Sequence, residues 1–103
     1  MSREILLLVD ALAHEKTVEK EIIFMALELA LASATKKRFQ EDIDIRVSIN
    51  RQTGDYESFR RWLVVDNGAI ENSIRQITLD DAQKIHNTIQ LNDYLEEPLE
   101  GVE

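Results

Sequence analysis

The stretch "IDIRVSINRQTGDYESFRRWLVV", residues 43–65, decides the fold. Its first seven residues alternate apolar and polar side chains, with Ile or Val at every second position, which predicts a half-buried strand. "NRQTGD" predicts a turn, in which Gly54 can take a positive φ. Tyr56 to Val65 then form the return strand, so this stretch predicts an antiparallel hairpin.

Two arginines, Arg60 and Arg61, directly precede the only tryptophan of a chain with a formal net charge of −8. Alternation places Arg61 on the same face as Phe59 and Leu63, which indicates a bulge or a buried ion pair. We expect one arginine to pack on an aromatic ring and the other to pair with an acid. A grip on single-stranded nucleic acid is the alternative, but such platforms carry several aromatic residues, which here make up 6% of the chain.

Further along, Ile74 to Leu79 predict a third strand, whereas Asp80 to His86 fit either a strand or a helix. Residues 91–103 hold five acids and no Lys or Arg, which predicts a short acidic C-terminal segment. Without these acids the net charge of −8 falls to −3, so residues 1–90 are only mildly acidic. Non-specific nucleic-acid binding by the whole chain is disfavoured, because it depends on neutralising phosphates.

Two helices are expected before the hairpin. Ser2 is a suitable N-cap for a helix from Arg3 to Lys16, and Thr17 or a residue near it for one from about Val18 to Phe39. The predicted class is α+β: two N-terminal helices packed on a small antiparallel three-stranded sheet, in a single domain of residues 1–103.

The second helix is apolar nearly all round, which is typical of a helix buried on more than one side. With Glu28 at the centre of the solvent side, Phe24, Met25, Leu31 and Ala32 flank it. The opposite, expected core stripe comprises Ile22, Ile23, Ala26, Ala30, Ser33 and Ala34. Either the first helix and the sheet cover both sides, or the residues beside Glu28 dock another protein.

Three consecutive cations, Lys36, Lys37 and Arg38, end this helix. Cations are favourable at a helix C-terminus, by about 0.3–1 kcal/mol each. Three in a row exceed what a cap needs, so contact with phosphate or with an acidic partner is the other interpretation.

Few enzyme classes fit the composition. With no cysteine there is neither a disulfide scaffold nor a thiolate zinc site, and we expect no cofactor and no metal. His14 and His86 are isolated, and there is no glycine-rich phosphate loop. No apolar stretch is long enough to span a bilayer, so no membrane partner is expected.

The order of segments resembles a known family. The matching pieces are "EILLLVDALAHEKTVEKEIIFMALELALASATKKRF", "DIDIRVSINRQTGDYESFRRWLVVD", "ITLDDA" and "LNDYLEEPLE". They are similar to the N-terminal domain of NusA, a bacterial transcription elongation and termination factor. The likeness covers nearly the whole chain and departs at "NGAIENS".

The resemblance implies a non-catalytic, cytoplasmic module that binds RNA polymerase at the flap-tip helix of the β subunit, beside the RNA exit channel. It implies roles in pausing, termination and antitermination, with the α C-terminal domain as a further polymerase contact. Relatives continue into a long helix, so the chain is expected to be a truncated N-terminal domain of a longer, multidomain protein, and a monomer.

The candidate sites follow from the patterns and the resemblance together. For polymerase binding they are Phe24, Met25, Glu28 and Leu31. For contact with a nascent RNA hairpin, weak and only within the complex, they are Lys36, Lys37, Arg38, Arg60 and Arg61. The main alternative is a self-sufficient RNA-binding domain that uses the same basic residues, and the weakest is a small acid–base enzyme that uses carboxylates.

Overall fold

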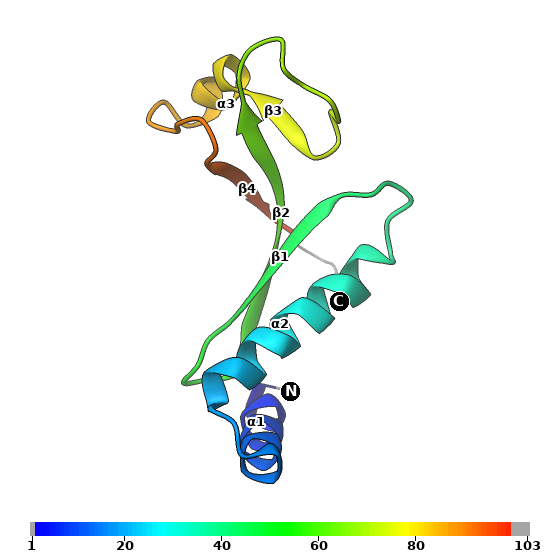
Figure 1. Ribbon diagram of the computed structural model, residues 1–103, viewed down its shortest axis with the longest axis vertical. Helices are drawn as coiled ribbons and strands as arrows, with labels where there is room; N and C mark the ends of the chain where they lie inside the picture. The colour runs from blue at the N-terminus through cyan, green and yellow to red at the C-terminus, as the bar shows by residue number, and fades with distance from the viewer. Residues whose placement is uncertain (1, 100–103) are drawn as a thin grey trace.

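Strand β2, Tyr56–Val65, is the long central element of the molecule, which measures 49 × 26 × 21 Å (Figure 1). A computed structural model describes residues 2–99. The first half of β2 pairs antiparallel with β1, Asp44–Ile49, in an unbroken register from Asp44 opposite Arg61 to Ile49 opposite Tyr56. The predicted hairpin is confirmed, and this register contains no bulge at Arg61.

The hairpin turn is built as its residue types suggest. The Asn50 side-chain oxygen accepts hydrogen bonds from the amides of Gln52 and Thr53. Gly54 has a φ of 81° and donates its N–H to the Asn50 carbonyl at 2.8 Å. Only glycine takes this conformation at little cost, so Gly54 fixes the turn geometry.

Two further strands pair with β2 between Phe59 and Val65. β3, Gln76–Thr78, pairs with it in parallel, and β4, Tyr94–Pro98, pairs antiparallel along its other edge. The sheet therefore has four strands and is mostly antiparallel, where three antiparallel strands were expected. The loop of residues 66–75 runs back beside β2 before β3 begins, so β3 starts in the same direction as β2.

Strand β4 lies in the segment that was expected to be only an acidic tail. Leu95 is buried opposite Trp62, and this apolar pair holds the acidic strand on the sheet. The acids beyond Leu99 lie outside the described residues.

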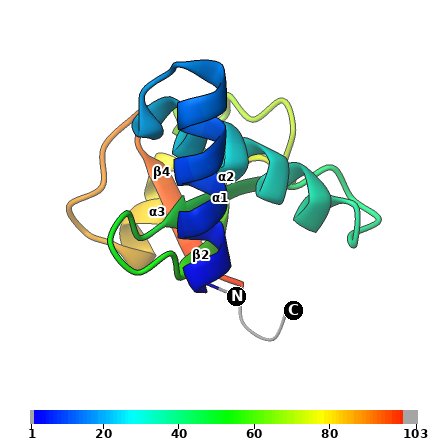
Figure 2. The same cartoon turned by 90° about the horizontal axis from the view of Figure 1, so that it is seen from below.

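Helices α1, Ser2–Lys16, and α2, Lys20–Lys36, form a hairpin at one end of the molecule. α2 lies along β1, and Figure 2 shows α1 lying across α2. The main core is a single cluster of Val9, Phe24, Ile43, Ile45, Val47 and Ile49. The alternating residues of β1 thus meet the helices, as their spacing predicts.

The second helix begins and ends inside its predicted range. Its N-cap is Glu19, without a side-chain hydrogen bond, and not Thr17. Thr17 has a φ of 55° in the turn between the two helices, so it is unable to act as an extended N-cap.

The segment that the sequence left undecided is a short helix, α3, Leu79–Ile85. The Thr78 hydroxyl accepts a hydrogen bond from the Asp81 amide, which satisfies one of the free N–H groups of the first turn. Figure 1 shows α3 and β3 at the end of β2 away from α1 and α2, with β4 running from there toward the middle of β2. Within residues 2–99, no helix has the length and apolarity needed to cross a membrane.

Candidate protein-interaction surface on the second helix

Glu28 faces the sheet and not the solvent, which reverses the expected orientation of α2. Its carboxylate accepts a hydrogen bond from the Ile49 amide at 2.9 Å and one from Arg51 Nη1 at 2.6 Å. The Ile49 amide lies on the outer edge of β1, away from β2, and would otherwise lack a partner in the sheet. Satisfying it is the physical reason for the inward position of a charged residue.

Arg51 fixes this orientation from the hairpin turn. Its guanidinium donates to Glu21 and Glu28 and lies over the Phe24 ring, 4.7 Å from the centroid. The hydrogen bonds with the two carboxylates raise the pKa of Arg51, and the bond from Arg51 lowers the pKa of Glu21. Phe24 is only 5% exposed beneath this cluster.

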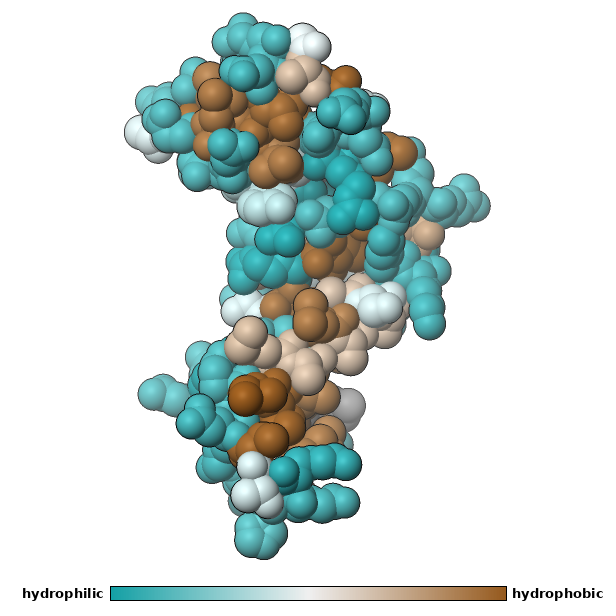
Figure 3. Space-filling model, in the orientation of Figure 1, coloured by the Kyte–Doolittle hydropathy of each residue, from teal (hydrophilic) through white to brown (hydrophobic). Residues whose placement is uncertain are grey.

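The opposite face of α2 is apolar and exposed. Ile22 is 55% exposed, Met25 54% and Leu29 74%. These residues follow the i, i+3, i+7 spacing of one helix face, with Ala26 and Ala30 beside them. We call this stripe of five residues the α2 face. Figure 3 shows it as an apolar band along α2, and the exposed Leu7 and Leu8 of α1 add apolar surface at the same end of the molecule.

The prediction that α2 is apolar all round is correct, whereas the assignment of its faces is wrong. Of the expected docking residues only Met25 is well exposed, since Phe24 is buried, and Leu31 and Glu28 are half-buried. Of the expected core stripe only Ile23 packs against the core, while Ile22, Ala26, Ala30, Ser33 and Ala34 are exposed. The spacing of Glu21 and Glu28, two turns apart on one face, together with an arginine after β1, is the signal that could have identified the buried face.

The basic residues at the end of α2 differ in their surroundings. Lys36 forms an ion pair with Asp42, whose pKa is lowered, mainly by the hydrogen bond from Lys36. Lys37 and Arg38 are exposed, and within residues 2–99 neither takes part in an ion pair. Two of the three cations are therefore accessible to a ligand.

Arg60 and Arg61 each make intramolecular contacts through their guanidinium groups. Arg60 lies over the Trp62 ring, 4.4 Å from the centroid, and donates to the Ile74 carbonyl at 3.1 Å. Arg61 lies 4.0 Å over the Tyr94 ring and donates to Asp44 at 3.0 Å. The expected division, one arginine on an aromatic ring and the other paired with an acid, is confirmed.

Ion pairs connect these two regions. Asp42 pairs with Arg75 at 3.3 Å, and Arg75 in turn lies 3.5 Å from Asp44, the partner of Arg61. Lys36 and Arg61 thus end one chain of alternating charges that joins α2 to the sheet. They do not form a surface of unopposed positive charge, as an RNA-binding domain would require.

The His, Asp and Glu residues outside these ion pairs form no candidate metal or catalytic cluster in the described part of the chain. Within residues 2–99, no group of three or more His, Asp or Glu residues is placed to hold a metal ion. His14 and His86 are both exposed and lie on α1 and just after α3, at opposite ends of the molecule.

The class of the protein is that of a small α+β domain, with a four-stranded sheet and a helix whose apolar face is exposed. The family model described as the NusA N-terminal domain matches residues 4–103, so the chain belongs to the NusA N-terminal domain family.

Relatives with known names support the same family. The chain is 38% identical over 96 residues to the transcription termination/antitermination protein NusA of Bacillus subtilis (strain 168), covering 93% of this chain and 25% of that protein. It is 35% identical over 79 residues to the protein of the same name from Rickettsia conorii, covering 77% of this chain and 15% of that one. The chain therefore spans a quarter or less of these relatives.

A solved structure agrees with the fold. The solution structure of the N-terminal domain of NusA from B. subtilis is similar with a TM-score of 0.71 and 37% sequence identity. The match covers 96% of this chain and 78% of that chain.

Proposed function

We propose that this chain is a non-catalytic module that binds RNA polymerase and so attaches a transcription termination and antitermination factor to the transcribing enzyme. The names of the relatives support the assignment of the chain to such a factor, since both relatives are transcription termination/antitermination proteins. The observation that carries the binding role is the α2 face, an apolar stripe that remains exposed although α1 and the sheet are already packed.

The partner proposed for the α2 face is the flap-tip helix of the polymerase β subunit. An amphipathic helix fits beside an exposed apolar helix by matching residues three and four positions apart. Ile22, Met25 and Leu29 make the contact. The other expected contact residues lie on the opposite side of α2, where they hold the helix against the core and β1. They are Phe24, Glu28 and Leu31.

In this position the module lies beside the RNA exit channel, in the cytoplasm, where it prolongs pauses and assists termination and antitermination. The α C-terminal domain of the polymerase is a second proposed contact, and the chain acts as a monomer. No cofactor is needed, because attachment requires only complementary surfaces.

Contact with a nascent RNA hairpin is a second proposed role, favoured by the exposure of Lys37 and Arg38. Cations contact closely spaced phosphates without reading sequence. On an acidic chain this contact adds little affinity alone, so it depends on attachment to the polymerase, which raises the local concentration of RNA.

The test of the binding role is a pull-down of RNA polymerase with the chain carrying Leu29→Glu. Placing a carboxylate in an apolar contact removes about 2 kcal/mol of burial, so we expect polymerase binding to fall about tenfold or more. Ile85→Glu is the matched control, since Ile85 is 63% exposed on α3 at the other end of the molecule.

The same pull-down with polymerase that lacks the flap tip identifies the partner. Loss of binding supports the proposal. Retention of full binding without the flap tip, or equal binding by the Leu29→Glu and Ile85→Glu chains, would overturn it.

A further inference from the structure

The outer edge of strand β4 leaves backbone hydrogen-bonding groups unpaired. The Val64 amide donates to the Asp93 carbonyl and the Leu99 amide to the Ser58 carbonyl, so odd-numbered residues of this segment face β2. In an antiparallel pair the alternate residues face the other way, and here these are Tyr94, Glu96 and Pro98. In the part of the chain that the structure describes, no strand pairs with this side.

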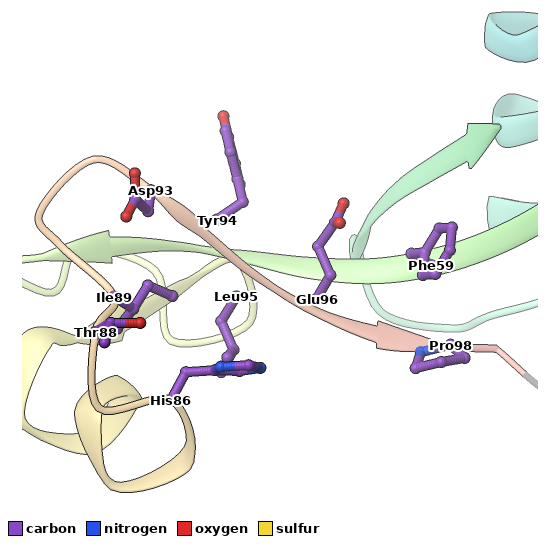
Figure 4. A pocket seen from close by; sticks show the side chains of 9 residues that line it. All are labelled: Phe59, His86, Thr88, Ile89, Asp93, Tyr94, Leu95, Glu96 and Pro98. Carbon is purple, nitrogen blue, oxygen red and sulfur yellow. The ribbon is translucent and has the colours of Figure 1, made fainter.

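A groove of about 530 Å³ follows this edge. Its lining comprises Phe59, His86, Thr88, Ile89, Asp93, Tyr94, Leu95, Glu96 and Pro98. In Figure 4, Tyr94 and Glu96 point to one side of β4, and Leu95 points to the other side, toward His86. Because residues from both faces of the sheet line it, the groove runs along the edge of the strand and not across one face.

Acids predominate along β4 itself, although Arg46 lies over Phe59 and Arg61 over Tyr94 on one side of the groove. Residues 85–99 contain Asp93, Glu96 and Glu97 but no Lys or Arg. Asp93 and Glu97 are exposed, and Glu96 is half-buried where it accepts hydrogen bonds from Arg46 at 2.6 and 3.0 Å. An acidic edge favours a positively charged ligand and disfavours a nucleic acid.

Two other occupants fit less well. A second copy of the chain pairing β4 with β4 would bring the acids of both strands close together, which is unfavourable. Acids and a proline also protect edge strands from aggregation. Protection alone, however, does not require a groove with apolar walls such as Ile89 and Leu95.

We propose that the edge of β4 binds an extended, basic segment of a partner protein, which adds to the sheet as a fifth strand. Main-chain hydrogen bonds to Tyr94 and Glu96 give affinity, and side chains that alternate between the two sides of the strand give specificity. Cationic side chains on the side of Leu95 meet the exposed Asp93 and Glu97, while apolar ones on the other side meet Tyr94 and Pro98. The site lies apart from the α2 face, and this inference does not depend on polymerase binding.

The test is an NMR titration with the hexapeptide acetyl-Lys-Val-Lys-Val-Lys-Val-amide, which has the required charge and alternation. We expect slower hydrogen exchange at the Tyr94 and Glu96 amides on binding, because these donors gain partners. A peptide of the same sequence with every backbone nitrogen methylated keeps its charge but loses its donors, so it should bind about fivefold or more weakly.

Two variants separate backbone pairing from simple attraction. Glu96→Pro removes the outward N–H without disturbing the ladder to β2, since proline is tolerated on sheet edges. Glu96→Gln keeps the N–H and removes the same charge. Circular dichroism checks that both fold, and we expect the hexapeptide to bind the proline variant about fivefold more weakly than the glutamine variant.

Several results would overturn the proposal. These are equal binding of the methylated peptide, no binding at millimolar concentration, dimerisation of the chain through β4, or protection of the same amides by a single-stranded RNA oligonucleotide. Leu29→Glu should leave hexapeptide binding unchanged, so failure here and failure of polymerase binding are distinguishable.

Discussion

At the scale of single residues, Gly54 holds the hairpin turn against the start of α1. Its φ is 81°, and a Cβ placed there would lie 1.9 Å from the Ser2 carbonyl oxygen. Both the conformation and the contact require a residue without a side chain. The turn residue thus determines how closely the first helix approaches the sheet.

We expect Gly54→Ala to lower the free energy of unfolding by about 3 kcal/mol. The left-handed conformation costs about 1–2 kcal/mol, and displacing the Ser2 backbone adds to it. Thermal unfolding measures the effect. Gly68→Ala is a matched control, because Gly68 has a φ of 82° with nothing within 4 Å of the added Cβ. Equal losses in the two variants would contradict the packing role of Gly54.

At the scale of elements, the end of α2 offers a second test. Reversing the charge of Lys36, Lys37 and Arg38 together should spare polymerase binding but shorten hairpin-dependent pauses, because contact with RNA phosphates is lost. A Lys36→Glu variant is the control for the ion pair with Asp42. A stable triple variant with an unchanged pause lifetime would remove the RNA role.

Elements also show what the sequence could and could not predict. The alternation from Ile43 to Ile49 identified the strand and its buried face, because both depend on neighbouring residues. The buried face of α2 was misassigned, since it depends on pairing between Glu28 and groups 21 and 23 residues away. The parallel direction of β3 was missed for a similar reason, because it depends on the path of the loop before Gln76.

At the scale of the whole molecule, ion pairs connect helices to strands and should make stability depend on pH. Hydrogen bonds from Arg51 and Lys36 hold the pKa of Glu21 below its usual value of 4.5 and that of Asp42 below 3.8. Groups with depressed pKa values stabilise the fold above their unfolded pKa, and this contribution is lost as pH falls through the folded pKa.

We therefore expect the melting temperature to change little above about pH 5 and to fall below about pH 4. The double variant Glu21→Gln, Asp42→Asn should melt at a lower temperature at neutral pH and show a shallower fall in acid. Both carboxylates are exposed, so 1 M salt should reduce the difference. An identical acid profile for the variant and the original chain would exclude these two residues as its source.

Strand β2 has a mechanical consequence for the molecule. β1 pairs with Tyr56–Arg61 and β4 with Phe59–Leu63, so the two ladders overlap in the middle of β2. Within the described residues, no break in strand pairing therefore separates the end with α1 and α2 from the end with α3. Bending the molecule in the middle would require breaking inter-strand hydrogen bonds, whereas a loop would swivel freely. The domain therefore acts as a stiff spacer, and a partner held at one end fixes the direction in which the other end points.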